Sequence, residues 1–224
     1  MKLTIFAATG GIGRQILEQA LAAGHDVTAV VRNPGNLPRN LNGTRVIGAD
    51  LAVPEAAALE TAVAGADAVL SSLGPRPMTK AGVAEHGTGA IVRAMQATGV
   101  RRILVVSAAP ISTVPSPSRP NPPRHDPGEG FLMRNLLTPF AKTVMRERYA
   151  DLALMEDVLR ASGLDWTIFR PPRLTNGPLT GKYRTAFGQN LRRGALISRA
   201  DVAQAMLAAV VQPATIRQAV GIAY

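Results

Sequence analysis

The segment at residues 6–13, Phe-Ala-Ala-Thr-Gly-Gly-Ile-Gly, constrains the fold of this chain more than any other. A short apolar run at residues 3–7 predicts a buried strand, and apolar residues after the glycines recur at helical spacing, at positions 12, 16, 17, 20 and 21. In a strand, glycine turn and helix in this order, the backbone can approach a pyrophosphate, and the helix amino terminus offers it unpaired N–H groups and a positive dipole end. The segment therefore predicts dinucleotide binding, with a glycine-rich turn that binds nothing as the alternative.

Length and composition indicate one globular domain. The chain has 224 residues, 46% of them hydrophobic, which suits a single α/β domain with a large core. No apolar run approaches the roughly eighteen residues of a membrane span, and the short apolar run after Lys2 does not read as a signal peptide. The absence of cysteine excludes disulfides and a thiol nucleophile, and we expect a cytoplasmic protein.

The pattern from residue 26 to residue 107 alternates strands with helices. We expect strands at residues 26–31, 45–47, 67–73 and 102–106, and helices at residues 56–64 and 79–98. Such alternation predicts a Rossmann-like, doubly wound parallel sheet with helices on both faces. Ligands of such sheets collect at the carboxyl ends of the strands.

Several candidate residues follow predicted strands. Arg32 stands where sites that prefer NAD carry an acidic residue, so we expect NADP(H) rather than NAD(H); a solvent-facing arginine is the alternative. Asp50 could accept a hydrogen bond from adenine or cap the following helix. Gly74 and Ser107 follow the next two strands.

The net charge of +10 could recruit nucleic acid, but the sequence has no long basic run and no nucleic-acid motif. We expect a basic surface with an anionic small ligand, and neither nucleic acid nor membrane as partner.

The alternation stops at residue 108. Seven prolines lie between Pro110 and Pro127, and we interpret residues 108–130 as a flexible cover over the substrate pocket or as plain disorder. Residues 131–161 should be helical in two pieces and residues 165–169 a sixth strand. Residues 174–188 should be irregular, followed by a short strand at 195–198, a helix at 199–211 and a closing strand at 219–224.

These features resemble the NmrA-like, NAD(P)H-binding group of atypical short-chain dehydrogenases/reductases, and within it the NADPH-dependent flavin and biliverdin reductases. The resemblance spans nearly the whole chain and rests on residues 6–13, 30–32, 73–76, 106–108, 158–164 and 178–183. The first segment marks the superfamily only, whereas the stretch from Glu156 through Tyr183 is more specific.

The resemblance implies a set of cofactor contacts. The glycine turn would bind the pyrophosphate and Arg32 the 2′-phosphate; the turn residues are Thr9, Gly10, Gly11, Ile12 and Gly13. The remaining positions would border the adenine, line the cofactor groove or lie beside the nicotinamide: Asp50, Leu51, Leu73, Gly74, Arg76 and Ser107. Three departures stand out. Ala7 replaces the usual first glycine, Arg173 replaces a histidine of the reductases, and the loop after Ser107 is longer and richer in proline.

The tyrosines suggest which reaction to expect. Ordinary short-chain dehydrogenases protonate a carbonyl with a tyrosine helped by a lysine four residues later, but Ala153 and Phe187 follow Tyr149 and Tyr183 at that spacing. We therefore expect an acceptor that needs little help with protonation, such as a flavin, a quinone or a conjugated tetrapyrrole.

Our hypothesis is NADPH-dependent hydride transfer to such an acceptor. Ser107 would hydrogen-bond the nicotinamide carboxamide or the acceptor, and Arg173 and Tyr183 would shape the substrate pocket. A strand-end hydroxyl satisfied by the backbone is the alternative for Ser107. The alternative function is a non-catalytic NADP(H)-binding sensor or regulatory protein.

Overall fold

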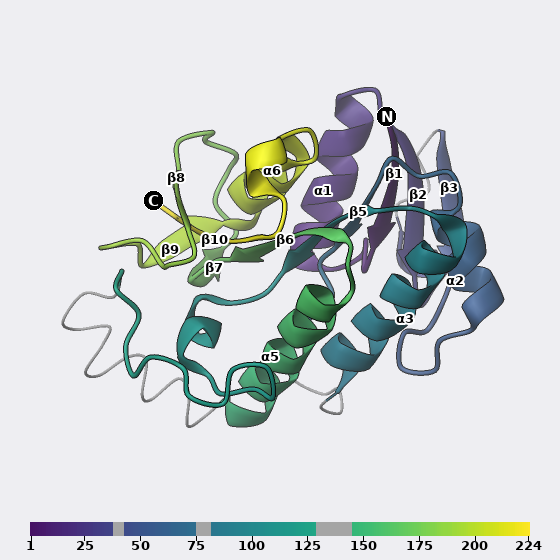
Figure 1. Cartoon of the computed structure of the whole chain (residues 1–224). Coiled ribbons are helices and arrows are strands. Elements are labelled where there is room, and N and C mark those ends of the chain that lie inside the picture. The colour runs from purple at the N-terminus through teal and green to yellow at the C-terminus, as the bar shows by residue number, and fades with distance from the viewer. Residues whose placement is uncertain (38–42, 75–81, 129–144) are drawn as a thin grey trace.

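The computed structural model describes residues 1–37, 43–74, 82–128 and 145–224. Its main feature is an eight-stranded sheet in the order β3-β2-β1-β4-β5-β6-β10-β8 (Figure 1). The strands are β1 (Lys2–Phe6), β2 (Asp26–Val31), β3 (Thr44–Gly48), β4 (Ala68–Ser71), β5 (Arg102–Val106), β6 (Asp165–Arg170), β8 (Arg184–Phe187) and β10 (Gln218–Ala223). All neighbours pair in parallel except β8, which runs antiparallel to β10. A separate parallel pair is formed by β7 (Arg173–Thr175) and β9 (Leu196–Ser198).

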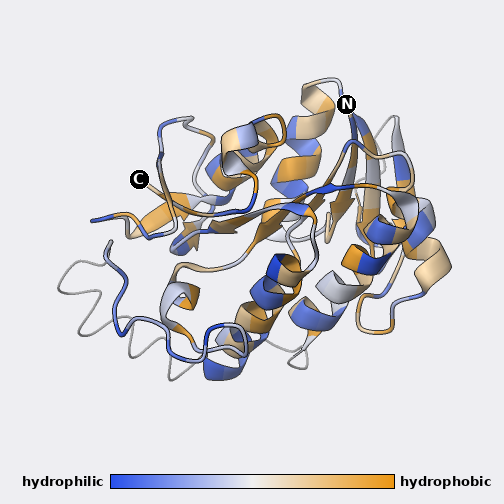
Figure 2. Ribbon diagram, in the orientation of Figure 1, coloured by the Kyte–Doolittle hydropathy of each residue, from blue (hydrophilic) through white to orange (hydrophobic). Residues whose placement is uncertain are grey.

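Helices cover both faces of the sheet (Figure 1). One apolar cluster joins the sheet to α2 (Ala56–Val63), α3 (Val83–Thr98) and α5 (Arg146–Ala161), and the other joins it to α1 (Gly11–Ala22) and α6 (Arg199–Ala209). Successive strand residues contribute to opposite clusters: Ile5 belongs to the cluster of α1 and Phe6 to that of α2. Figure 2 shows the resulting pattern, with apolar strands inside and helices that carry polar residues on one side. The predicted doubly wound fold is confirmed.

Some predicted boundaries were wrong. The stretch 174–188, expected to be irregular, contains the end of β7 and all of β8. The short strand β8 is largely exposed and pairs antiparallel with β10, so the sheet is not wholly parallel. The last helix ends at Ala209 rather than at 211. Of the helix expected over 131–161, the second piece is α5, whereas residues 131–144 lie outside the described residues.

Within the described ranges, no helix has the length and apolar character needed to cross a membrane.

Candidate cofactor site

The glycine turn joins β1 to α1 in a conformation that leaves room for very little side chain. Ala7 takes a left-handed backbone with φ +56°, and its carbonyl accepts the Gly10 N–H at 2.8 Å. A Cβ built on Gly13 would lie 2.6 Å from the Ser72 Oγ and closer still to the Ala7 carbonyl oxygen. Only glycine fits at position 13, because the helix start packs directly against the turn and the exit of β4.

The amino terminus of α1 has N–H donors for which the described residues provide no acceptor. Its N-cap is Gly10, so no side chain accepts the first-turn N–H groups, and no acidic residue occupies that turn. The positive end of the helix dipole therefore faces outward beside Thr9 and Gly11, which are half-buried and exposed respectively. A pyrophosphate fits this cradle because it supplies the missing acceptors and negative charge without needing side-chain space.

Arg32 and Asp50 lie at the same edge of the sheet as the turn. Arg32 directly follows β2, which pairs with β1, and its side chain is exposed. Asp50 follows β3 and accepts the Ala52 N–H through Oδ1 at 3.0 Å. Its alternative role as a helix cap is wrong, because α2 begins at Ala56 with Glu55 as its N-cap. Asp50 is exposed and so remains a candidate for the adenine.

The next two predicted residues lie beside the same residue of α3. Leu51 and Leu73 are buried and both approach Gly87 of α3, where a Cβ would lie 3.1 Å from the Leu51 Cβ and 2.7 Å from the Leu73 Cδ2. The lack of a side chain at Gly87 lets α3 approach both leucines closely. Gly74 follows and is half-buried, whereas Arg76 lies outside the described residues.

Ser107 follows β5 and is bound from two sides. Its N–H donates to the Phe169 carbonyl at 2.7 Å, and its hydroxyl donates to Glu156 Oε1 at 2.7 Å. The hydroxyl is thus satisfied by a buried carboxylate on α5 and not by the backbone, which was the alternative considered for it. Its oxygen keeps acceptor capacity, because a hydroxyl has two lone pairs.

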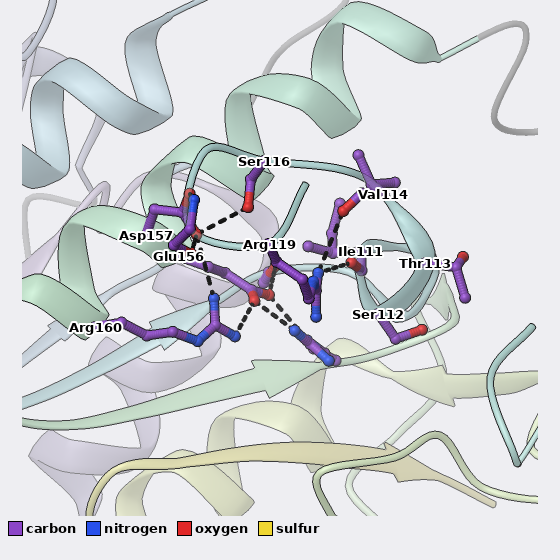
Figure 3. Close-up of polar contacts among 12 residues, drawn as sticks. Ile111, Ser112, Thr113, Val114, Ser116, Arg119, Glu156, Asp157 and Arg160 are labelled. Carbon is purple, nitrogen blue, oxygen red and sulfur yellow. Dashed lines mark hydrogen bonds and ion pairs between the residues drawn. The ribbon is translucent and has the colours of Figure 1, made fainter. Parts of the chain in front are cut away.

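Glu156 forms the centre of a buried charge cluster that sequence reasoning missed (Figure 3). Besides Ser107, it accepts Arg170 Nε at 2.9 Å and Nη2 at 2.5 Å, and Arg160 Nη2 at 2.7 Å. Burial alone would raise the pKa of Glu156, but the hydrogen bond and charge of Arg170, followed by Arg160 and the Ser107 hydroxyl, lower that pKa below its ordinary value. The carboxylate therefore stays ionised inside the protein and fixes Ser107.

The proline-rich segment after Ser107 is attached to α5 by hydrogen bonds. Asp157 accepts the Ser116 hydroxyl at 3.0 Å, the Ser118 N–H at 3.0 Å and the Ser118 hydroxyl. Arg119 donates through Nη2 to the Ile111 carbonyl at 2.6 Å, as Figure 3 shows. Burial, followed by the positive charge of Arg170, lowers the pKa of Arg119. Residues 111–119 thus lie beside the cluster around Glu156.

The two residues predicted for the substrate pocket, Arg173 and Tyr183, form no hydrogen bond with Ser107 and contact other parts of the described chain. Arg173 is the first residue of β7 and is exposed, two positions after Pro171, whose carbonyl accepts the Ala109 N–H at 2.9 Å. Tyr183 packs against the apolar cluster of α1 and α6. Burial, with a further effect of the Asp201 charge, raises the pKa of Tyr183. Among the hydrogen bonds of the described residues, none joins Arg173 or Tyr183 to Ser107.

A second buried carboxylate, also missed from the sequence, holds the chain before Tyr183. Asp201 accepts the N–H groups of Thr180 and Gly181 at 2.9 and 2.8 Å, the Ser198 hydroxyl at 2.9 Å and the Tyr224 hydroxyl at 2.6 Å. Burial would raise the pKa of Asp201, but these donors, Tyr224 first, lower it to about 2. Asp201 thereby ties residues 180–181 to the start of α6.

Comparison with known proteins identifies the family of this chain. Residues 7–213 match the model of a protein family described as NAD(P)H-binding. The UPF0659 protein C216.03 of Schizosaccharomyces pombe is 29% identical over 215 residues, which cover 92% of this chain and 83% of that protein.

Two solved structures show the same fold. A short-chain dehydrogenase/reductase from Veillonella parvula in complex with NADP has a TM-score of 0.78 at 20% identity, covering 100% of this chain and 94% of that one. ChuY, an anaerobillin reductase from Escherichia coli O157:H7, has a TM-score of 0.75 at 24% identity, covering 100% and 97%. The family match confirms that the chain belongs to the NAD(P)H-binding family, and the two structures confirm its fold.

Proposed function

Because this chain belongs to the NAD(P)H-binding family, we propose that it is an NADPH-dependent reductase that transfers hydride to a flavin-like, quinone-like or other conjugated acceptor. The observation that carries the proposal is the amino terminus of α1, which has no side-chain cap and packs so closely at Gly13 that no side chain fits at that position. The reductase and NADP-bound proteins of the same fold support the reaction class.

Different residues bind different parts of the cofactor. The N–H groups at the start of α1 bind the pyrophosphate, and Arg32 binds the 2′-phosphate as a planar, always charged donor. Leu51 and Leu73, which both lie beside Gly87, form an apolar wall of the cofactor site, and Asp50 accepts from the adenine amino group. NADP(H) is preferred because an exposed arginine, with no carboxylate beside it in the strand-end sequence, attracts the additional phosphate.

Ser107 holds the reactive end of the cofactor. Its proton is directed to Glu156, so its oxygen presents a lone pair that accepts an N–H of the nicotinamide carboxamide. Glu156 and Arg170 fix the side-chain position of Ser107 in turn. When bound, the nicotinamide supplies the hydride, and the chain contributes orientation and exclusion of water from the reacting faces. The segment that begins at residue 108 covers this end of the cofactor, and Arg173 and Tyr183 shape the acceptor pocket farther from Ser107.

Two measurements on the purified chain test the proposal. Calorimetric titration should show tighter binding of NADPH than of NADH, and Arg32→Met should remove about tenfold or more of that preference. Arg45→Met, which removes another exposed arginine on the neighbouring strand β3, should leave the preference unchanged. NADPH oxidation should then be measured with FMN, riboflavin and a small quinone.

The outcomes separate the candidate functions. Turnover with any of these acceptors supports the reductase, whereas tight NADPH binding without turnover on all of them favours an NADP(H)-binding sensor. Ser107 is 6% exposed and already engaged by Glu156, and this limited access is the observation that keeps the sensor as second candidate. No binding of NADPH would refute both.

A further inference from the structure

Arg199 is the first residue of α6, yet its side chain lies at the glycine turn. A Cβ built on Gly11 would lie 2.7 Å from both Cδ and Nε of Arg199. Gly11 is the first residue of α1, so the guanidinium extends from one helix start across another. The Arg199 side chain thus occupies the space that a Cβ at position 11 would fill.

No acidic group among the described residues compensates the positive charge of Arg199. It lies at the amino ends of two helices, where the helix dipole disfavours a cation. Its Nη1 donates to the neutral side chain of Asn176 at 2.7 Å, and none of the ion pairs among the described residues includes it. Arg199, half-buried as a residue, is thus held in place by an amide, and its Nε and Nη2 donate to none of the described residues.

We propose that Arg199 is a second cationic contact of the cofactor and binds its diphosphate. This inference rests on the proposed cofactor site and adds a residue and a specificity to it. The diphosphate would receive backbone N–H groups from the start of α1 on one side and the Arg199 guanidinium on the other, oriented by Asn176. Arg199 therefore acts on the part that NADPH and NADH share, whereas Arg32 acts only on the 2′-phosphate.

The division of labour between the two arginines is tested with three ligands. NADPH, NADH and adenosine 2′-monophosphate are titrated by calorimetry into the full chain and into Arg199→Met, Arg32→Met and Arg217→Met. Arg217 precedes β10 at the opposite edge of the sheet and controls for the loss of one positive charge.

Arg199→Met should weaken NADPH and NADH alike, by about tenfold to hundredfold, because a charge-assisted contact to the diphosphate is lost. It should leave adenosine 2′-monophosphate, which has no diphosphate, unchanged. Arg32→Met should give the complementary pattern: weaker NADPH and adenosine 2′-monophosphate with NADH little affected.

Gly11→Ala is a second, independent test of whether the Arg199 side chain contributes to NADPH binding. Its Cβ displaces the Arg199 side chain, so it should weaken NADPH binding in the parent chain but not in the Arg199→Met background. Thermal unfolding of Arg199→Met should not shift downward, since the removed charge opposes two helix dipoles.

If Arg199→Met binds NADPH and NADH as tightly as Arg217→Met does, the inference is wrong while the proposed function stands. Selective loss of NADPH over NADH would also overturn it, because that pattern places Arg199 at the 2′-phosphate. Failure of the parent chain to bind either dinucleotide overturns the proposed function itself.

Discussion

Arginines occur in two very different settings at the carboxyl edge of this sheet. Arg160 and Arg170 both donate to the buried Glu156, and their positive charge is matched within the protein. Arg32 and Arg199 flank the glycine turn, and neither takes part in an ion pair among the described residues. We infer that Arg160 and Arg170 stabilise the fold, whereas the charges of Arg32 and Arg199 are free to bind a ligand. Removing a charge should therefore lower stability at the first place and ligand affinity at the second.

The largest expected effect is that of Glu156→Gln. It leaves Arg170, which is 4% exposed, without its carboxylate, and breaking a buried ion pair from one side costs about 3–5 kcal/mol of unfolding free energy. Urea unfolding followed by circular dichroism measures the change.

The exposed pair Arg14–Glu18 on α1, 2.8 Å apart, provides the control. Glu18→Gln should change the unfolding free energy by no more than about 1 kcal/mol, because solvent screens a surface pair. Equal effects of the two substitutions would show that the Glu156 cluster is not a stabilising centre.

Asp201→Asn tests a second fully buried carboxylate through the pH dependence of stability. The pKa of Asp201 in the folded chain is about 2, below the ordinary value of 3.8, so its ionisation stabilises the fold above about pH 4. That contribution, about 2 kcal/mol, should be lost as the pH falls from about 4 towards 2. Unfolding free energies at pH 7, 4 and 2.5 should show a gap between parent and variant that narrows in acid. A gap that stays constant over this range would mean that the charge of Asp201 is not what stabilises the fold.

Ser107→Ala tests whether Ser107 both stabilises the fold through Glu156 and contacts the cofactor. Loss of the hydroxyl removes one donor from Glu156 and should lower the unfolding free energy by about 1 kcal/mol. If the Ser107 oxygen also accepts the carboxamide, NADPH binding should weaken by about tenfold. Thr4→Val removes another buried hydroxyl, which donates to the Ala62 carbonyl, and should leave NADPH binding unchanged. A stability loss with unaltered NADPH affinity would make Ser107 a support of Glu156 alone.

The two settings also differ in what the sequence predicts. The glycine turn and Arg32 are local patterns, a strand end followed by a fixed spacing, so they can be identified without knowing the fold. Glu156 and Arg170 meet only because α5 packs against β6, and Arg199 reaches Gly11 from the opposite end of the chain. No spacing in the sequence indicates either contact.

The strands show the same limit. The buried apolar runs of β1, β2 and β5 were predicted to within a residue, because a strand covered on both faces must be apolar throughout. The exposed strand β8, Arg-Thr-Ala-Phe, does not need to be apolar, and it forms because it pairs antiparallel with β10. Its residues give no periodic signal.

The smallest effect concerns strain at the glycine turn. Ala7 has φ +56°, a left-handed conformation that costs a residue with a Cβ roughly 1–2 kcal/mol. Ala7→Gly removes that cost but adds about 0.5–1 kcal/mol of chain entropy lost on folding, so the unfolding free energy should rise by no more than about 1 kcal/mol. Ala8→Gly is the control: Ala8 is fully buried and has no positive φ, so this substitution should be destabilising. Opposite signs in urea unfolding at two adjacent alanines would locate the strain in the binding turn, whereas two losses of similar size would mean that Ala7 is not strained. Opposite signs would thus mean that backbone strain in the glycine turn lowers the unfolding free energy of the protein, whereas the paired charges around Glu156 raise it.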